Sequence, residues 1–187
     1  MTRVGGSTPV IGIAGWKKSG KTTLAERLIA EFTRRGLKVA SVKHAHHDFR
    51  IDDAETDSAR HRRAGASQVA VVSAKRWALI AELEGAPEPD LAQIVAWLGP
   101  CDLVIVEGYK SVPIPKIEAR RSAAFGTEPL ADKDPSVIAI AADHAADGRN
   151  LPVFSLDDIS GIADFIAKFV GLGAAVALAA ADAPAKS

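Results

Sequence analysis

The sequence has one cysteine, no net charge and no long apolar run, and each absence excludes a class of protein. A lone thiol, Cys101, can form neither an internal disulfide nor a cysteine-cluster metal site. Basic and acidic residues number 23 each, which argues against a sequence-independent grip on nucleic acid. No apolar run spans a membrane, and the N-terminus lacks the form of a signal peptide. We therefore expect a cytoplasmic protein that binds neither membranes nor nucleic acid.

The length of 187 residues suits a single α/β domain with a sizeable core. We expect residues 9–170 to form this domain. Residues 1–8 are polar and predicted to be flexible, and the Ala-rich residues 171–187 are predicted to be disordered. No internal repeat or domain linker is visible in the sequence.

The strongest motif is a phosphate-binding loop, G-x-x-x-x-G-K-[ST], near the N-terminus. In such loops glycines let successive backbone N–H groups face phosphate oxygens at the start of a helix. A glycine-rich turn can match by chance, but the apolar strand at residues 10–14 and the helical pattern at 21–35 favour nucleotide binding. The predicted nucleotide-binding residues are Gly15, Trp16, Lys17, Lys18, Ser19, Gly20, Lys21, Thr22 and Thr23.

Two residues of this loop have distinct expected roles. Lys21 is expected to reach the β and γ phosphates, and the Thr22 hydroxyl to complete the coordination of Mg²⁺. Buried strands are predicted at residues 38–43, 102–106 and 137–142, with helices between several of them. This alternation predicts a doubly wound, mostly parallel sheet in a three-layer α/β/α arrangement, as in P-loop NTPases.

Two acidic residues follow buried strands, at the edge of the sheet where ligands of such folds bind. Glu107 is the candidate for the second Mg²⁺ ligand, although aspartate is the usual residue and a surface acid would look the same. Asp143 could accept two N–H bonds from a guanine, which adenine cannot offer. An ordinary strand-end acid remains the alternative for Asp143.

The polar segment 44–58 carries further candidates and is predicted to be a loop. Asp52 could bind the metal or its water, and Asp57 could do so too or cap the helix that begins near residue 58. The histidines of this loop can be interpreted as a metal site or as contacts to a substrate or partner. These histidines are His44, His46 and His47.

Basic residues at two places could form a second anion site, since guanidinium and ammonium groups suit phosphate. Each of them could equally be a solvated surface residue. They are Arg60, Arg62 and Arg63 on a short helix, and Lys110, Lys116, Arg120 and Arg121 after the Glu107 strand.

These motifs together resemble the molybdopterin-guanine dinucleotide biosynthesis adaptor (MobB) family over residues 9–170. The phosphate loop is generic, but the histidine loop and the segments around Glu107 and Lys116 are specific to that family. The segments that carry the resemblance include residues 15–23, Val42-Lys43-His44, His46-His47-Asp48-Phe49, Ile51-Asp52, Asp57-Ser58-Ala59-Arg60-His61, Val106-Glu107-Gly108-Tyr109-Lys110 and Pro115-Lys116-Ile117-Glu118.

The resemblance implies a GTP- and Mg²⁺-binding protein with weak GTPase activity at most, typically a homodimer. It would assist a MobA-type molybdopterin guanylyltransferase in making the guanine dinucleotide form of the molybdenum cofactor, with molybdopterin or its guanine dinucleotide as a further ligand. Thr22 and Glu107 would hold Mg²⁺, and Asp143 would contact guanine. The residues that would hold phosphates are Gly15, Gly20, Lys21, Thr22 and Thr23.

Two departures from the family pattern affect these expectations. Residues 54–56 are Ala-Glu-Thr where the family often has Pro-Gly-Lys, and Trp16 stands where related dimerising switches carry a lysine. Two other functions remain open. One is a P-loop small-molecule kinase with Asp52 as base, and the other is a metal-delivery GTPase that uses the histidine loop.

Overall fold

The computed structural model describes residues 8–45, 56–126 and 128–173. Contacts within the chain divide it into two compact units, residues 1–44 with 91–187 and residues 45–90, which are treated separately below. Nearly all of the two terminal segments expected to be flexible or disordered lies outside the described residues.

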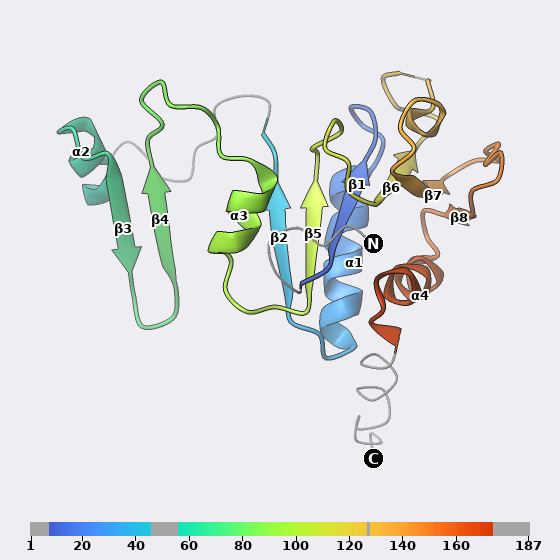
Figure 1. Ribbon diagram of the computed structural model, residues 1–187, viewed down its shortest axis with the longest axis horizontal. Coiled ribbons are helices and arrows are strands. Elements are labelled where there is room, and N and C mark those ends of the chain that lie inside the picture. Colours follow the sequence, from blue (N-terminus) through green and yellow to red (C-terminus); the bar gives the residue numbers. More distant parts are fainter. Residues whose placement is uncertain (1–7, 46–55, 127, 174–187) are drawn as a thin grey trace, which may run out of the picture. The chain divides into compact units, whose positions relative to one another are not determined.

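The first unit contains a six-stranded sheet in which every neighbouring pair of strands is parallel (Figure 1). The strand order is β2-β5-β1-β6-β7-β8, so the chain leaves the central strand β1 and adds strands on both sides of it. This confirms the predicted doubly wound sheet, whose ligand site lies at the carboxyl ends of the strands. The strands are β1 (Val10–Ala14), β2 (Val39–Lys43), β5 (Leu103–Glu107), β6 (Lys116–Arg120), β7 (Val137–Ala142) and β8 (Val153–Ser155).

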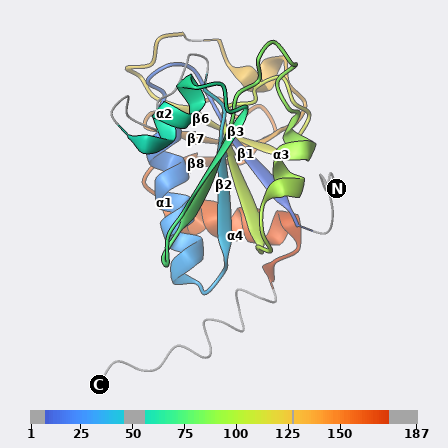
Figure 2. The same ribbon diagram turned by 90° about the vertical axis from the view of Figure 1, so that its left-hand side faces the viewer.

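Helices cover both faces of this sheet because its central strands are apolar on both sides. Ile11 and Ile13 of β1 belong to a core shared with α1 (Lys21–Arg34) and α4 (Ile159–Val170). Val10 faces the other way, into a smaller core with α3 (Leu91–Trp97). Figure 2 shows α1 and α3 on opposite sides of the sheet, which completes the three predicted layers. A short 3-10 helix, η1 (Leu130–Asp132), precedes β7.

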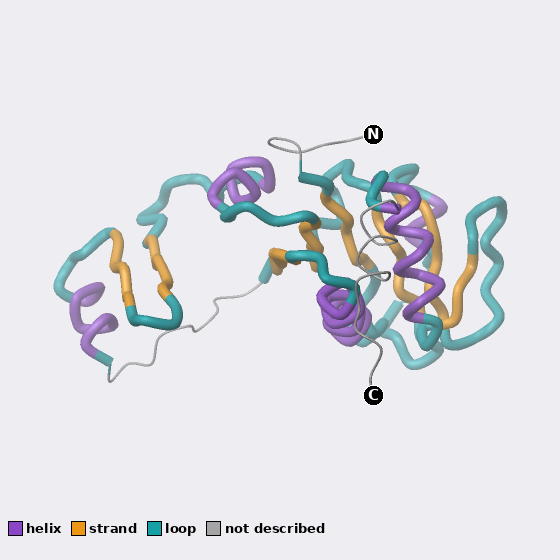
Figure 3. The backbone as a smooth tube through the Cα atoms, turned by 90° about the horizontal axis from the view of Figure 1, so that it is seen from below, coloured by secondary structure: helices purple, strands orange, loops and turns teal. Residues whose placement is uncertain are grey.

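The second unit consists of α2 (Asp57–Arg63) beside an antiparallel hairpin, β3 (Gln68–Val72) and β4 (Trp77–Ala81) (Figure 3). The sequence pattern predicts strands at residues 68–73 and 76–82, with the second as an edge strand. The structure contains both, but they pair with each other, and β4 is not an edge strand of the main sheet. The cap of α2 is Thr56, whose side chain accepts a hydrogen bond from the Ala59 N–H at 3.3 Å. The expectation that Asp57 caps this helix is therefore wrong.

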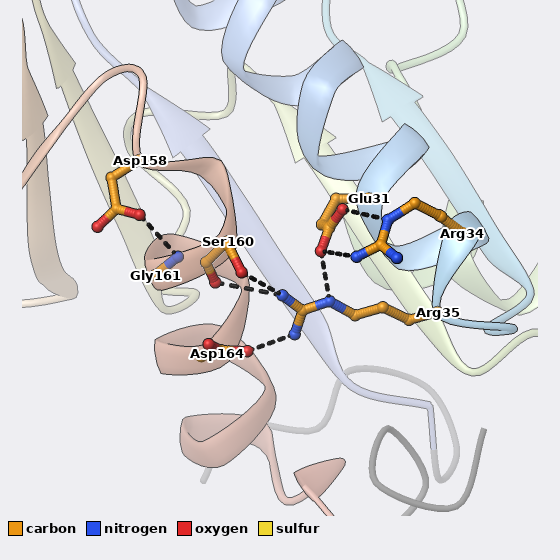
Figure 4. Close-up of polar contacts among 7 residues, drawn as sticks. All are labelled: Glu31, Arg34, Arg35, Asp158, Ser160, Gly161 and Asp164. Carbon is orange, nitrogen blue, oxygen red and sulfur yellow. Dashed lines mark hydrogen bonds and ion pairs between the residues drawn. The ribbon is translucent and has the colours of Figure 1, made fainter. Parts of the chain in front are cut away.

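A polar clasp joins the end of α1 to the start of α4 (Figure 4). Arg35 donates a hydrogen bond to Glu31 at 2.7 Å and also binds Asp164 and Ser160 on α4. Hydrogen bonds from Arg34 and then from Arg35 lower the pKa of Glu31 to about 2. Since a lowered carboxyl pKa favours the folded state, this contribution is complete above the ordinary value of 4.5 and is lost as the pH falls toward 2.

We expect Arg35→Met to lower the free energy of unfolding by about 1–2 kcal/mol at pH 7, because the Arg35 side chain is nearly buried between two carboxylates. Arg34→Met is the matched control and should have the smaller effect, since the Arg34 side chain is 71% exposed and solvent screens its pair. Urea denaturation at several pH values measures both. The Arg35 effect should shrink between pH 4.5 and pH 2, and equal effects of the two substitutions would contradict this account.

Candidate nucleotide-binding site

The phosphate loop joins the end of β1 to the start of α1 and lies against the neighbouring strand β6. Gly15 has a φ of 150°, and a Cβ atom there would lie 2.3 Å from Ser19 Oγ and 2.5 Å from the Ala119 carbonyl oxygen. No side chain fits in this space. The loop therefore takes its shape because residue 15 is glycine.

The N-terminus of α1 differs from those of α2 and α4, which are capped by the side chains of Thr56 and Asp158. Gly20 occupies the cap position of α1 with a φ of 91°, and neither a capping side chain nor an acidic residue lies in the first turn. Ser19 Oγ is buried without a hydrogen-bond partner among the described residues. Unpaired N–H groups and an unused hydroxyl at a helix N-terminus suit a bound phosphate.

Thr22 and Glu107 meet at the side of the loop that faces β5. The Thr22 hydroxyl donates a hydrogen bond to Glu107 Oε1 at 2.7 Å, and Lys43 Nζ lies 3.5 Å from Oε2. Parallel pairing causes this meeting, because Glu107 at the end of β5 lies in register with Ile13 of β1. A hydroxyl and a carboxylate are the oxygen ligands that Mg²⁺ takes beside phosphate, so the residues present fit this ion.

Lys21 turns back over the loop, and its amine donates a hydrogen bond to the Trp16 carbonyl oxygen at 2.7 Å. Burial lowers the pKa of Lys21, the positive charges of Lys110 and Lys43 lower it further, and Glu107 opposes them. This partly desolvated ammonium therefore lies among like charges that Glu107 offsets only in part. A phosphate group would supply further negative charge, so the electrostatics of the loop also fit a polyphosphate.

The connection after β6 forms hydrogen bonds with the phosphate loop on the side opposite β5. The Trp16 indole N–H donates to the Glu128 carbonyl oxygen at 2.6 Å, and the Phe125 N–H donates to the Lys17 carbonyl oxygen at 3.0 Å. The Lys18 amine lies 4.4 Å from the centre of the Phe125 ring. These contacts of Phe125 and Glu128 were not predicted, because the sequence indicated only a loop at residues 123–134.

Asp143 stands at the end of β7, beyond β6, and is held by its neighbours. It accepts a hydrogen bond from the Ser122 N–H at 2.9 Å, and His144 Nδ1 lies 2.7 Å from the same oxygen. The bond to His144 and then that from Ser122 lower the pKa of Asp143. Arg121, next to Ser122, lies over Gly20, with its Nε 2.8 Å from where a Cβ would stand. Since residues 121–122 follow β6 directly, their place beside the loop could have been expected from the shared edge of the sheet.

Three residues predicted to contact a ligand or partner, His44, Lys110 and Lys116, lie in three different environments. His44 follows β2, and its N–H donates to the Glu107 carbonyl oxygen at 2.9 Å. Lys110 lies on the Trp16 ring, with its amine 4.2 Å from the ring centre. Lys116 is only 1% exposed, and its amine donates to Asp134 and Ser136 at 2.6 Å each. This engagement in the protein interior argues against a ligand contact for Lys116.

The remaining predicted residues lie in the second unit or outside the described residues. Asp57 and Arg60 form an exposed ion pair of 3.4 Å on α2, in the second unit. Asp52, His46 and His47 lie outside the described residues. Within residues 8–45, 56–126 and 128–173, no group of three or more His, Cys, Asp or Glu side chains is placed to hold a metal ion. No described helix is long and apolar enough to cross a membrane.

A family model described as MobB, molybdopterin guanine dinucleotide synthesis protein B, matches residues 10–143. The chain belongs to the MobB family. It is 38% identical to the molybdopterin-guanine dinucleotide biosynthesis adapter protein of Haemophilus influenzae, over 84% of this chain and 87% of that one. It is 37% identical to the adapter protein of the same description from Escherichia coli, over 87% of this chain and 93% of the other.

Solved MobB structures share the fold of this chain. The crystal structure of a molybdopterin-guanine biosynthesis protein B superposes with a TM-score of 0.66 at 28% identity, and covers 86% of this chain and 99% of its own. The crystal structure of Bacillus subtilis MobB gives a TM-score of 0.65 at 26% identity, over 86% of this chain and 96% of that one.

In this MobB-family chain we expect Gly15→Ala to lower the free energy of unfolding by about 2–4 kcal/mol, because the new methyl group meets the β6 backbone and the φ is unfavourable. Gly99→Ala is the matched control, since a Cβ there meets nothing within 4 Å, and it should change the stability by less than about 0.5 kcal/mol. Thermal and chemical denaturation measure both. If Gly15→Ala left the free energy of unfolding unchanged, the loop would not be held against β6.

Proposed function

We propose that this chain binds Mg·GTP at the phosphate loop and serves as an adaptor in the guanylation of molybdopterin. The observation that carries the proposal is the 2.7 Å pairing of Thr22 with Glu107, on the β5 side of a loop that holds the partly buried amine of Lys21. Membership of the MobB family, whose relatives are named as molybdopterin-guanine dinucleotide biosynthesis adapter proteins, supports the adaptor role.

Mg²⁺ supplies charge neutralisation to the phosphates when it is bound. Thr22 and Glu107 would hold the ion, Lys21 would exchange its bond to the Trp16 carbonyl for a phosphate oxygen, and Ser19 would donate its unused hydroxyl. Glu107 is already engaged with Thr22 and Lys43, which leaves it poorly placed to activate water. We therefore propose weak GTP hydrolysis at most.

Guanine selectivity is assigned to Asp143. Its low pKa keeps the carboxylate charged, and its position at the end of β7 lies on the same edge of the sheet as the phosphate loop. A charged carboxylate can accept the two N–H groups of a guanine edge, and adenine has no matching pair of donors. The bond from the Ser122 N–H fixes the orientation of the carboxylate.

The proposed partner is a MobA-type molybdopterin guanylyltransferase, to which the adaptor would present GTP, with molybdopterin or its guanine dinucleotide near the same edge of the sheet. In this scheme the enzyme forms the bond between GMP and molybdopterin. The adaptor binds and orients the nucleotide, so its own contribution depends on Lys21 and Thr22.

The hairpin supports a further proposal, that the chain forms a homodimer. Val72 and Trp77 are directly opposite each other on β3 and β4, and Leu79 lies two residues farther along the same face. All three side chains are more than half exposed, whereas Val69 on the other face is buried. An apolar hairpin face of this kind is typical of an interaction surface, and we assign it to a second copy of this chain.

Calorimetric titration with GTP and ATP in the presence of Mg²⁺ tests the nucleotide proposal. We expect Lys21→Ala to weaken GTP binding more than about 100-fold, since it removes the cation nearest the β and γ phosphates. Asp143→Ala should remove the preference for GTP over ATP, while the exposed control Asp157→Ala should not. Preference of the wild type for ATP, with transfer of its γ-phosphate to a small molecule, would favour the kinase and overturn the adaptor.

The adaptor role is tested by adding the protein to a MobA-type enzyme with molybdopterin and GTP. Wild-type protein should raise the rate of dinucleotide formation, and Lys21→Ala should not. An equal effect of the two proteins would separate the adaptor role from nucleotide binding and contradict the proposal.

Sedimentation equilibrium tests the homodimer. We expect Trp77→Lys to weaken self-association at least about tenfold, because a charge on the apolar face must be desolvated on contact. Trp97→Lys is the matched control, since Trp97 on α3 is 67% exposed and Trp77 is 69% exposed. A wild-type protein that stays monomeric at about 100 μM, or a larger effect of the control, would rule out the hairpin face.

A further inference from the structure

Lys110 is a half-buried cation whose partner is an aromatic ring. Its amine lies 4.2 Å from the centre of the Trp16 ring, within the phosphate loop. Among the described residues, no carboxylate lies within ion-pair distance of this amine, whereas Lys43 and Lys116 each have one. A cation on an aromatic face keeps N–H groups that point away from the ring and can bind an oxygen.

A sharp backbone turn at Gly108 and Tyr109 sets the position of Lys110. Gly108 and Tyr109 both have positive φ values, 95° and 48°, and the latter is unfavourable for a residue with a side chain. The Tyr109 and His44 rings lie 4.7 Å apart and are tilted by 42°, and a Cβ on Gly108 would lie 3.1 Å from the His44 Cβ. The sharp turn after β5 is thus packed against the end of β2, and Lys110 projects from it over Trp16.

Lys110 also acts on the phosphate-binding lysine. Its positive charge is the second cause, after burial, of the lowered pKa of Lys21. The closeness of two ammonium groups that repel each other across a loop is favourable only when an anion lies near both. A cation–π contact is worth less than a charge-assisted hydrogen bond to phosphate, so the Trp16 ring can hold Lys110 without competing with a ligand.

The strand order indicates which phosphate of a bound nucleotide would lie near Lys110. Lys110 follows Glu107 on the β5 side of the loop, where Thr22 and Glu107 pair. Asp143, the proposed guanine contact, lies at the end of β7 on the opposite side of β1. A nucleotide that runs from β7 to β5 has its terminal phosphate on the β5 side.

We propose that Lys110, supported by the ring of Trp16, binds the terminal phosphate of a nucleoside triphosphate and so distinguishes it from a diphosphate. This inference rests on the nucleotide site proposed above and adds a specificity-determining residue to it. A site of this kind would release the nucleotide, or change its affinity for a partner, once the terminal phosphate is lost.

Calorimetric titration of the full chain with a non-hydrolysable GTP analogue and with GDP tests the proposal. We expect Lys110→Met to weaken binding of the triphosphate about 10- to 100-fold and of GDP less than about threefold, because a charge-assisted bond to one phosphate is lost. Lys110→Arg should recover most of the difference. Lys168→Met is the control, since Lys168 is an exposed lysine in the last turn of α4.

Each result separates this inference from the function on which it rests. Equal losses for both nucleotides with Lys110→Met, or no loss for either, would overturn the role of Lys110 while GTP binding stands. Failure of the wild type to bind any nucleotide would overturn both proposals. The wild type could instead prefer ATP, and Lys110→Met could weaken binding of ATP more than binding of ADP. That result would support the terminal-phosphate role of Lys110 and overturn the guanine adaptor.

Trp16 gives an independent spectroscopic readout. The other two tryptophans, Trp77 and Trp97, are exposed and can be replaced by phenylalanine, which leaves Trp16 as the only indole. Binding of the triphosphate should draw Lys110 toward the ligand and change the Trp16 emission, and GDP should change it less. The same emission change in Lys110→Met would contradict the proposal.

Discussion

The absence of a side chain at residue 15 is the constraint on which the nucleotide site depends. A Cβ on Gly15 would collide with Ser19 and with the Ala119 carbonyl oxygen of β6, so the loop and the sheet are in direct backbone contact. The loop therefore inherits the rigidity of the central strands, β1 and β6. The connection after β6 adds hydrogen bonds to Trp16 and Lys17, which fix the loop further. A cradle formed before its ligand arrives loses less conformational entropy on binding.

The same rigidity holds charges in an unfavourable arrangement. Lys21 is partly desolvated and lies in the field of Lys110 and Lys43, with Glu107 as the opposing charge. The first turn of α1 has no acidic residue, and its cap has no side-chain acceptor. Each of these features reduces the stability of the protein alone and each is relieved by a polyphosphate with Mg²⁺. Stability elsewhere comes from the apolar cores on both faces of the sheet and from the Arg35 clasp between α1 and α4.

The sequence predicted the parts of the site that depend on local pattern. The phosphate loop has a fixed spacing, and the apolar run before Glu107 placed that carboxylate at a strand end. Lys116 illustrates the opposite case. The sequence suggested either an anion contact or a solvated surface cation for Lys116, but it is buried because Asp134 and Ser136 fold onto its amine. A strand at residues 76–82 was likewise expected at the edge of the sheet, but it pairs with β3 away from the main sheet.

The sequence by itself determined the parallel sheet, the helix after the loop and the phosphate-binding motif, because strand hydrophobicity, helix periodicity and glycine spacing act over a few residues. The tertiary structure decided which side chains meet. Thr22 reaches Glu107 only through the register of β1 with β5, and Lys110 reaches Trp16 only because the turn after β5 packs on His44. The local patterns indicated that Thr22 and Glu107 share a site, but which side chains touch depends on strand order and on backbone turns between residues distant in the chain.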